Sequence, residues 1–205
     1  VPSNTVNAEI DQKPWGIAPA ISEQIYTLED ALLFAGMQMV ILRNADVIKI
    51  ACQSLLTNIS ACIMTEKSGG YWLQTIYYPF HYFATYAKGT VLKTASTGPC
   101  YSCAEFDEVP YVDSLVVWNE EDQELVIFAV NRSEEELQKA EVDLQDFEIQ
   151  HVIESICMTA ENKKMTNMEQ HDAVIPKKEK NVEIETGRCQ ITLQPLSFNM
   201  VRLAV

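Results

Sequence analysis

The hydrophobic pattern in the first part of the chain predicts a helix, a strand and a second helix. Apolar residues recur at helical spacing over 31–42, and Thr27 precedes them with Asp30 three residues later, which approximates a capping box. The β-branched run 47–52 predicts a buried strand. The aromatic-rich stretch 72–86 predicts a helix over its later part. This order is typical of a slice of an α/β fold with a parallel sheet.

From residue 115 onward the pattern is that of antiparallel β-structure. The apolar runs 115–119 and 125–131 flank an acidic turn, which predicts a hairpin. Further short runs predict strands at 140–144, 150–159, 182–185, 189–193 and 199–203. Several short strands separated by polar loops predict a β-sandwich. The sequence changes character near residue 95, so we divide the chain into residues 1–95 and residues 96–205.

The first part does not form a closed architecture by itself. A single buried strand of the parallel type, with two helices, needs further strands on either side of it to complete a sheet. No other run before residue 95 supplies them. Either another chain provides these strands, or the first part packs on the sandwich in a reduced form.

The charge balance excludes several classes of partner. The chain of 205 residues carries a net charge of −14, from 29 acidic against 15 basic residues. Binding to nucleic acid or to an anionic membrane surface depends on clustered cations, so neither is expected. The longest apolar stretch, 31–42, is too short to span a bilayer. A neutral partner such as a sugar remains open.

The cysteines and histidines do not form a recognisable metal or redox motif. Of six cysteines only Cys100 and Cys103 lie close together, and a lone Cys-x-x-Cys lacks the second pair that a zinc ribbon needs. The three histidines are not at metal-ligand spacing, and no glycine-rich phosphate motif occurs. We therefore expect no metal and no cofactor. Free, mostly buried thiols and an N-terminus without a secretory signal predict a cytoplasmic protein.

Two features have both a structural and a functional interpretation. Asn119-Glu120 has the composition of a catalytic Asn-Glu dipeptide, but it is followed by two more acidic residues, so we interpret it as the hairpin turn. The aromatic stretch 72–80 is interpreted as core packing, with an aromatic wall beside a sugar site as the alternative.

At the same aromatic stretch the sequence resembles a known family. Residues 74–80, Gln-Thr-Ile-Tyr-Tyr-Pro-Phe, closely resemble the last part of the barrel in family 51 α-L-arabinofuranosidases. Other stretches that are similar to this family, in the same order, are 26–32, 45–51, 63–67, 109–111, 119–121, 127–132 and 199–203. Several separate motifs that agree in order form a specific signal, unlike any one of them alone.

The resemblance implies an α+β, mainly β fold class. It implies the end of a (β/α)8 barrel, that is its last helices and strand, followed by a C-terminal jelly-roll-like antiparallel β-sandwich. Residues 1–95 are then the barrel remnant, with 27–43 as the seventh helix, 47–52 as the eighth strand and 74–87 as the eighth helix. Residues 96–205 are the sandwich.

The resemblance also implies an activity for the parent enzyme. Such enzymes remove terminal α-L-arabinofuranosyl groups from arabinan or arabinoxylan oligosaccharides with retention, without a metal, through two glutamates. Both glutamates lie in motifs on earlier barrel strands, and neither motif occurs in this chain. We therefore expect no catalytic residue here and no turnover by this chain alone. The expected partners are the remainder of the barrel or homo-oligomer partners, together with arabinofuranosyl oligosaccharides.

Three residues are predicted to lie near the substrate. The family has a glutamine at the end of strand eight that contacts the arabinose, and Leu55 occupies its position here. Gln53 shares a strand face with Leu55 and substitutes for that glutamine only from one layer deeper. A leucine cannot donate a hydrogen bond to a sugar hydroxyl, so this departure weakens substrate binding. Trp72 belongs to the aromatic wall. The alternative function is a non-catalytic β-sandwich module for carbohydrate binding or subunit contact.

Overall fold

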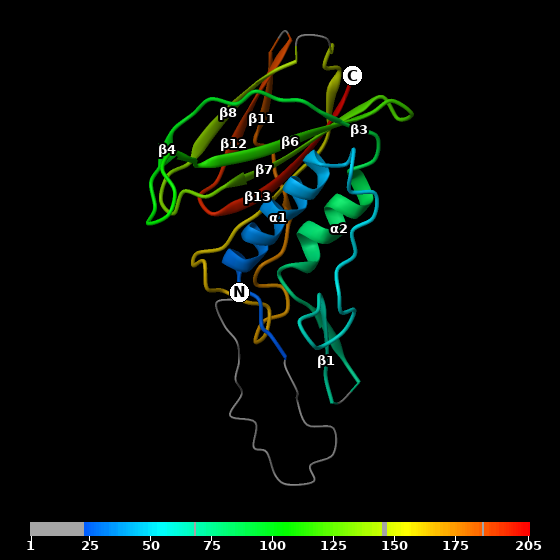
Figure 1. Cartoon of the computed structure of the whole chain (residues 1–205), viewed down its shortest axis with the longest axis vertical. Coiled ribbons are helices and arrows are strands. Elements are labelled where there is room, and N and C mark those ends of the chain that lie inside the picture. Colours follow the sequence, from blue (N-terminus) through cyan, green and yellow to red (C-terminus); the bar gives the residue numbers. More distant parts are fainter. Residues whose placement is uncertain (1–22, 68, 145–146, 186) are drawn as a thin grey trace.

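The chain folds into three layers, with one large sheet in the middle. The computed structural model describes residues 23–67, 69–144, 147–185 and 187–205. Two helices cover one face of a six-stranded antiparallel sheet, and a three-stranded antiparallel sheet covers the other face (Figure 1). The prediction of a mainly β fold with antiparallel sheets is confirmed.

The first helix, α1, extends from Leu28 to Arg43, as the hydrophobic spacing predicts. Its N-cap is Thr27, and the capping box is complete because Asp30 accepts a hydrogen bond from the Thr27 backbone while Thr27 Oγ1 accepts one from the Asp30 backbone. Its C-cap is Asn44, whose backbone N–H donates to carbonyls of the last turn.

The second helix, α2, extends from Tyr77 to Tyr86 and begins three residues later than the predicted 74–87. Pro79 lies in its first turn, where a missing backbone N–H costs no helical hydrogen bond. Before the helix, the backbone N–H of Gln74 donates to the carbonyl of Cys62, and the fully buried Gln74 side chain joins three segments of the chain. Its Nε2 donates to the carbonyls of Gln24 and Ala61, and its Oε1 accepts from the backbone of Tyr26.

The six-stranded sheet has the order β10-β9-β13-β7-β6-β3. Its strands are β3 (Thr90–Leu92), β6 (Val112–Asn119), β7 (Glu124–Asn131), β9 (His151–Met158), β10 (Lys177–Lys178) and β13 (Ser197–Ala204). The predicted hairpin is formed by β6 and β7, and Asn119 Nδ2 donates to the Asp122 carboxylate within its turn. The prediction that Asn119-Glu120 belongs to a turn is therefore confirmed.

The three-stranded sheet and two small hairpins complete the β-structure. The sheet has the order β11-β12-β8 and consists of β8 (Gln138–Asp143), β11 (Val182–Glu185) and β12 (Arg188–Leu193). The hairpins pair β1 (Ile63–Thr65) with β2 (Tyr71–Leu73) and β4 (Cys100–Tyr101) with β5 (Val109–Pro110). All five predicted later strands are present within a few residues of the expected bounds. Strands β1 to β5 and β10 were not predicted, because two- and three-residue pairs leave little pattern in a sequence.

Strand β7 is buried on both faces, which explains its continuous apolar run. The register pairs Phe128 with Met200 of β13, and both side chains face the helices. The next position pairs Ile127 with Val201, and both face the three-stranded sheet. A strand that contacts an apolar layer on each side has no polar face, so alternation is absent from its sequence.

Phe128 links the helix layer to the central sheet. Its ring is fully buried and stacks on Phe83 of α2, with the ring centroids 4.2 Å apart. Phe198 of β13 packs beside both rings. The two helices therefore share one continuous core with the sheet, although they belong to the part of the chain that precedes residue 95.

The predicted strand at 47–52 is wrong for this chain. Residues 44–47 form a turn and 48–53 are irregular, with Val47 73% and Ile50 83% exposed. A strand needs neighbours to pair its backbone N–H and C=O groups, and no other strand of the described residues lies alongside this segment. Without partners the β-branched run stays in solvent.

We expect the aromatic contact between layers to dominate stability. Phe128→Ala should lower the free energy of unfolding by about 3–5 kcal/mol, because it leaves a cavity between sheet and helices. Phe106→Ala is the matched control, since Phe106 is 64% exposed between β4 and β5, and it should change stability by less than about 0.5 kcal/mol. Urea unfolding followed by tryptophan fluorescence measures both. Equal effects of the two substitutions would contradict the layered core described here.

Candidate functional site

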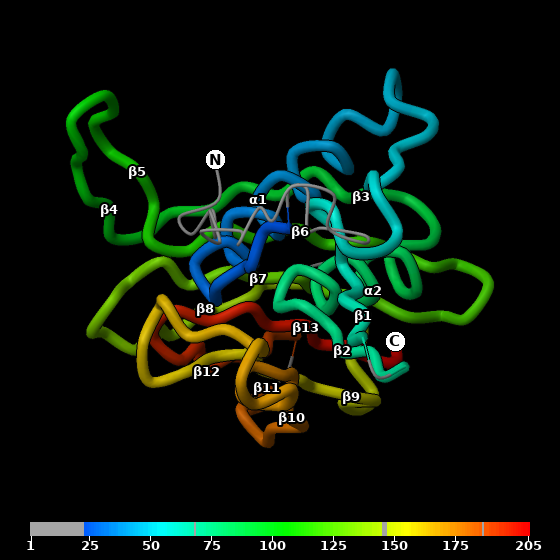
Figure 2. Tube along the Cα trace, turned by 90° about the horizontal axis from the view of Figure 1, so that it is seen from below, coloured from blue at the N-terminus to red at the C-terminus, as the bar shows by residue number. Residues whose placement is uncertain are grey.

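The exposed apolar surface of the molecule is concentrated in one stretch of sequence. Among the described residues, more than half of the exposed large hydrophobic side chains lie between positions 33 and 56. They are Leu33, Met37, Val40, Val47, Ile48, Ile50, Leu55 and Leu56. Exposed apolar side chains gathered in this way are a usual mark of an interaction site. Figure 2 shows the 44–56 segment, in light blue, projecting from the body of the molecule.

Helix α1 is apolar on two sides. One side, including Ala35 and Met39, is buried against the central sheet. The other side carries Leu33, Met37 and Val40, which are 58%, 55% and 54% exposed. These three residues are spaced by four and three positions, so they form one line along the helix, which we call the outer stripe. A helix that is apolar on opposite sides is typical of a position between two layers.

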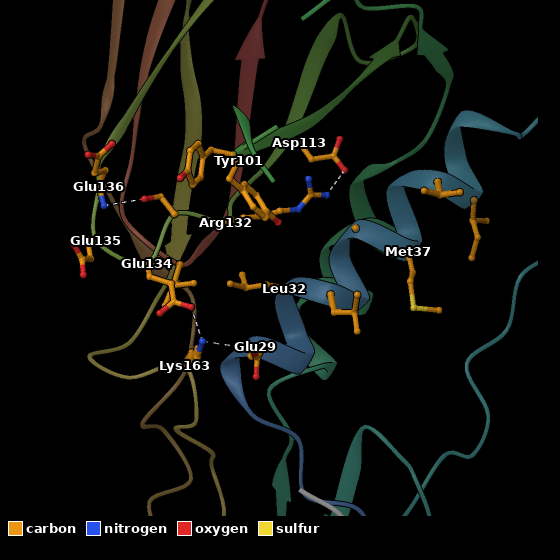
Figure 3. Close-up of a pocket in the computed structure, with 17 residues that line it drawn as sticks. Glu29, Leu32, Met37, Tyr101, Asp113, Arg132, Glu134, Glu135, Glu136 and Lys163 are labelled. Atoms are coloured by element: carbon orange, nitrogen blue, oxygen red, sulfur yellow. Dashed lines mark hydrogen bonds and ion pairs between the residues drawn. The ribbon is translucent and has the colours of Figure 1, made fainter. Parts of the chain in front are cut away.

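A groove of about 1030 Å³ lies beside the outer stripe. Helix α1 forms one wall of it, and residues of β4 and β6, together with residues that follow β5 and β7, form the opposite wall (Figure 3). We call it the α1 groove. The lining side chains on the opposite wall include Tyr101, Tyr111, Asp113 and Arg132. The strand β6 brings Asp113 to this wall, and the end of β7 brings Arg132.

The two ends of the α1 groove differ in charge. Near the N-terminus of α1 lie Glu29 and the consecutive carboxylates 134–136, opposed by Lys163. Lys163 Nζ lies 2.5 Å from Glu134 Oε1, and this hydrogen bond raises the pKa of the Lys163 ammonium. We call this region the acidic end.

The other end of the groove is positively charged. The Asp113 carboxylate lies between two guanidinium groups, 2.5 Å from Arg43 and 2.9 Å from Arg132. Arg43 also donates to the carbonyl of Ser114, and Arg132 donates to the carbonyl of Pro110. One carboxylate shared by two guanidinium groups leaves a net positive charge, so we call this region the basic end.

The predicted substrate residues lie on two different elements. Gln53 is half-buried on the irregular segment that follows α1, and its Nε2 donates to the carbonyl of Ser54. Leu55 lies on the same segment and is 48% exposed. Trp72 lies on β2, is 8% exposed, packs with Ile25 and Met64 and stacks on His171 with centroids 5.6 Å apart. The cluster around Trp72 does not include Gln53 or Leu55, and their contact with substrate stays a prediction.

The α1 groove was not predicted, although the spacing of apolar residues in the sequence indicates its apolar wall. The helical spacing was assigned to one buried side, whereas Leu33, Met37 and Val40 repeat the same spacing on another side. The opposite wall could not be found in this way, because Tyr101, Asp113 and the carboxylates 134–136 come from segments that only the fold brings together.

The family model that describes the C-terminal domain of α-L-arabinofuranosidases matches residues 4–197. The chain belongs to this family.

Curated relatives of this arabinofuranosidase domain are longer than the chain. The chain is 41% identical over 201 residues to an intracellular exo-α-(1→5)-L-arabinofuranosidase from Halalkalibacterium halodurans, and this match covers 98% of the chain but 40% of the relative. A Bacillus subtilis enzyme with the same description is 39% identical over 197 residues, with 95% of the chain and 39% of the relative covered. The chain therefore spans less than half of the length of these relatives.

Solved structures agree with this relationship. A family 51 α-L-arabinofuranosidase from Bifidobacterium longum superposes with a TM-score of 0.85 at 29% identity, over 93% of the chain and 38% of that structure. A family 51 arabinofuranosidase from Xanthomonas axonopodis has the same fold, with a TM-score of 0.81 at 22% identity over 92% of the chain and 38% of that structure.

No metal cluster or membrane helix is found in the described part of this arabinofuranosidase domain. Its histidine, cysteine and carboxylate side chains do not gather in groups of three or more that could hold a metal ion. Neither α1 nor α2 is long and apolar enough to cross a bilayer.

All six cysteines are free thiols, but only half of them are buried. The prediction of mostly buried thiols is therefore corrected, since Cys52, Cys100 and Cys103 are exposed. The buried thiols are those of Cys62, Cys157 and Cys189. Burial raises the pKa of each of these three to about 11, because the thiolate loses its hydration.

Thiol reactivity should divide the cysteines into two groups. The thiolate is the reactive form, so at pH 8 the buried thiols, with pKa values of about 11, should react with Ellman's reagent at least about tenfold more slowly than Cys52, Cys100 and Cys103. In denaturant all six should react at similar rates. A native protein in which every thiol reacts at one rate would contradict the burial of Cys62, Cys157 and Cys189.

Proposed function

We propose that this chain is the C-terminal part of an α-L-arabinofuranosidase that removes terminal non-reducing α-L-arabinofuranosyl groups from arabinan or arabinoxylan oligosaccharides. Its membership of the family and the names of its relatives support this activity. Those relatives are described as intracellular, which supports a cytoplasmic location for this protein as well.

One observation supports the proposal that the chain is part of a larger enzyme. The exposed apolar surface over 33–56 combines the outer stripe of α1 with a segment whose composition is that of a buried strand. Removing apolar surface from water contributes roughly 25 cal/mol per Å², so the exposure of these large apolar side chains favours a covering layer. The proposed covering layer is the part of the enzyme that the relatives carry outside their match to this chain.

In this proposal α1, residues 47–52 and α2 are the last elements of a (β/α)8 barrel. Residues 47–52 become the eighth strand once a neighbouring strand pairs with their backbone. The six-stranded and three-stranded sheets form the jelly-roll-like sandwich that follows the barrel. The division into 1–95 and 96–205 is kept as part of the proposal, although both parts contribute to one core.

The chemistry is assigned to two glutamates supplied by the remainder of the barrel. In a retaining glycosidase one carboxylate attacks the anomeric carbon and the other protonates the leaving oxygen, with the two groups roughly 5–5.5 Å apart. The reaction needs no metal and no cofactor. This chain contributes one wall of the substrate pocket, which carries Gln53 and Leu55. If the aromatic stretch 72–80 forms a wall beside the sugar, Trp72 belongs to it as well.

The structure offers less support for a separate carbohydrate-binding module. The outer face of the three-stranded sheet carries a charged ladder in which Arg188 lies 2.7 Å from Glu141 and 3.8 Å from Asp143. Among the described residues the exposed aromatic side chains of the molecule are Tyr71 and Phe106, and both lie on small hairpins rather than on this face. Sugar rings usually stack on aromatic platforms, so the enzymatic assignment is preferred.

A chimeric enzyme tests the proposed function. The part of the Halalkalibacterium halodurans relative that precedes its match is fused to this chain, and hydrolysis of an aryl α-L-arabinofuranoside is measured. The chimera should turn over the substrate, whereas the chain alone should show no turnover above the rate in buffer. Turnover by the isolated chain, or a folded chimera without any activity, would contradict the proposal.

Leu55 should limit substrate binding in the active chimera. Leu55→Gln restores an amide at the position of the family's substrate-contacting glutamine, and one recovered hydrogen bond should raise kcat/KM by about tenfold. Leu56→Gln is the matched control on the neighbouring residue, which is 75% exposed, and it should leave kcat/KM within about twofold. Equal effects of the two variants would remove Leu55 from the substrate pocket.

A further inference from the structure

The hairpin of β1 and β2 lies at the end of the molecule where both helices begin (Figure 1). The Thr75 hydroxyl, just before α2, donates to the backbone carbonyl of Thr27, the N-cap of α1, so the two helix starts are neighbours. In a (β/α)8 barrel each helix follows the C-terminal end of a strand, and the loops at that end form the active site. In the proposed function the hairpin belongs to the loop between the eighth strand and α2, so it lies at the catalytic end.

One face of this hairpin is buried. Met64 on β1 and Trp72 on β2 are cross-strand partners, and both pack with Ile25. The Trp72 ring also stacks on His171, which lies in the connection between β9 and β10. From the same connection the buried Asn167 amide donates a hydrogen bond to the backbone of β2. The connection between β9 and β10 therefore holds the hairpin by its Trp72 face.

The opposite face of the hairpin is open and carries an aromatic ring. Successive residues of a strand point to opposite faces, so Tyr71 points away from the Trp72 side. Tyr71 is 70% exposed, and its cross-strand partner Thr65 is exposed as well. Because most of this tyrosine lies in water, its ring is available to a ligand.

Hydrogen bonds connect the open face with the segment that carries the predicted substrate residues. Asn58 Oδ1 accepts from both the backbone N–H and the hydroxyl of Thr65, at 2.9 and 3.1 Å. The backbone N–H of Asn58 donates to the carbonyl of Ile63 on β1. The hairpin is therefore tied to the stretch of chain that contains Gln53 and Leu55.

The place of Tyr71 in the loop indicates which part of a substrate it meets. In a (β/α)8 barrel the catalytic groups lie at the strand ends, so the cleaved arabinosyl group lies deep in the pocket. A hairpin that extends beyond the strand lies nearer to the rim. At the rim an oligosaccharide presents the sugars of its leaving group, whose apolar C–H faces can stack on an aromatic ring.

We propose that Tyr71 is a stacking platform for the leaving-group sugar of an arabinofuranosyl oligosaccharide, at the rim of the substrate pocket, and that it favours oligosaccharides over short glycosides. This inference rests on the proposed function. Trp72 is 8% exposed and stacks on His171, so it anchors the hairpin instead of meeting the leaving group.

A ligand that resists hydrolysis tests the platform directly. The chimera is titrated in a calorimeter with a thio-linked (1→5)-arabinotriose, in which sulfur replaces the glycosidic oxygens. Tyr71→Ala should raise the dissociation constant at least about fivefold, because an aromatic stacking contact is lost. Tyr71→Phe keeps the ring and should stay within about twofold of the unmodified chimera. Phe106→Ala is the matched control, since it removes an exposed ring between β4 and β5, and it should also stay within about twofold.

Arabinose alone distinguishes the rim from the deep part of the pocket. A single sugar fills the position of the cleaved group and does not extend to the leaving-group side. Tyr71→Ala should therefore leave the affinity for arabinose within about twofold. An equal loss of affinity for arabinose and for the trisaccharide would overturn the proposal, because Tyr71 would then act on the cleaved sugar or on the fold.

The outcomes separate this inference from the proposed function. An active chimera in which Tyr71→Ala leaves trisaccharide binding unchanged overturns the platform and leaves the proposed function intact. An inactive chimera in which Tyr71→Ala weakens trisaccharide binding, while Tyr71→Phe does not, supports the platform and contradicts the proposed function. A chimera with neither turnover nor trisaccharide binding counts against both.

Folding of the chimera is controlled with a second relative. A chimera with the N-terminal part of the Bacillus subtilis enzyme is made in parallel, and circular dichroism reports whether each chimera and each variant is folded. The loss of affinity on Tyr71→Ala should appear in every chimera that binds the trisaccharide. Failure of both chimeras to fold or to bind it counts against the platform.

Discussion

The structure depends on the burial of one strand from both sides. Strand β7 has no polar face, so the molecule needs an apolar layer above it and another below it. The three-stranded sheet supplies one layer through Ile191 and Leu193, and the helices supply the other through Phe83 and Met39. Because the helices are required for this core, the part of the chain that resembles a barrel remnant is also a structural part of the sheet domain.

Local sequence patterns correctly predicted the elements whose stabilising contacts lie close together in the sequence. The capping box at Thr27 and Asp30 is a contact within one helical turn, so it could be inferred directly from the sequence. The hairpin of β6 and β7 was predictable for the same reason, since its turn and its two apolar runs are adjacent. The run 47–52 has an equally clear pattern, but no strand of the described residues pairs with it, and a strand cannot form from composition alone.

The candidate site was less predictable, because it is built from remote segments. The outer stripe of α1 could have been found from the spacing of Leu33, Met37 and Val40, but a helix is usually assigned a single buried side. The opposite wall needs the fold, since Tyr101 and Arg132 are distant in the sequence and meet only at the ends of their strands. Gln53 and Leu55 were identified through the family motif, and no strand of the part of the chain that the structure describes pairs with their segment.

The ion pairs of Asp113 determine how α1 is held. Arg43 is in the last turn of α1, Asp113 is on β6 and Arg132 directly follows β7, so a single carboxylate connects the helix to both strands of the hairpin. With its N-terminus also fixed, by backbone hydrogen bonds from Leu28 to Met165 and from Glu29 to Lys163, the helix is clamped at both ends. Any body that binds the outside of α1 therefore takes its angle from the central sheet. Because both ends of α1 are bound to the sheet domain, the helix and the central sheet form one structural unit. The orientation of a partner on the outer face of α1, relative to the sheet, is therefore set by these contacts.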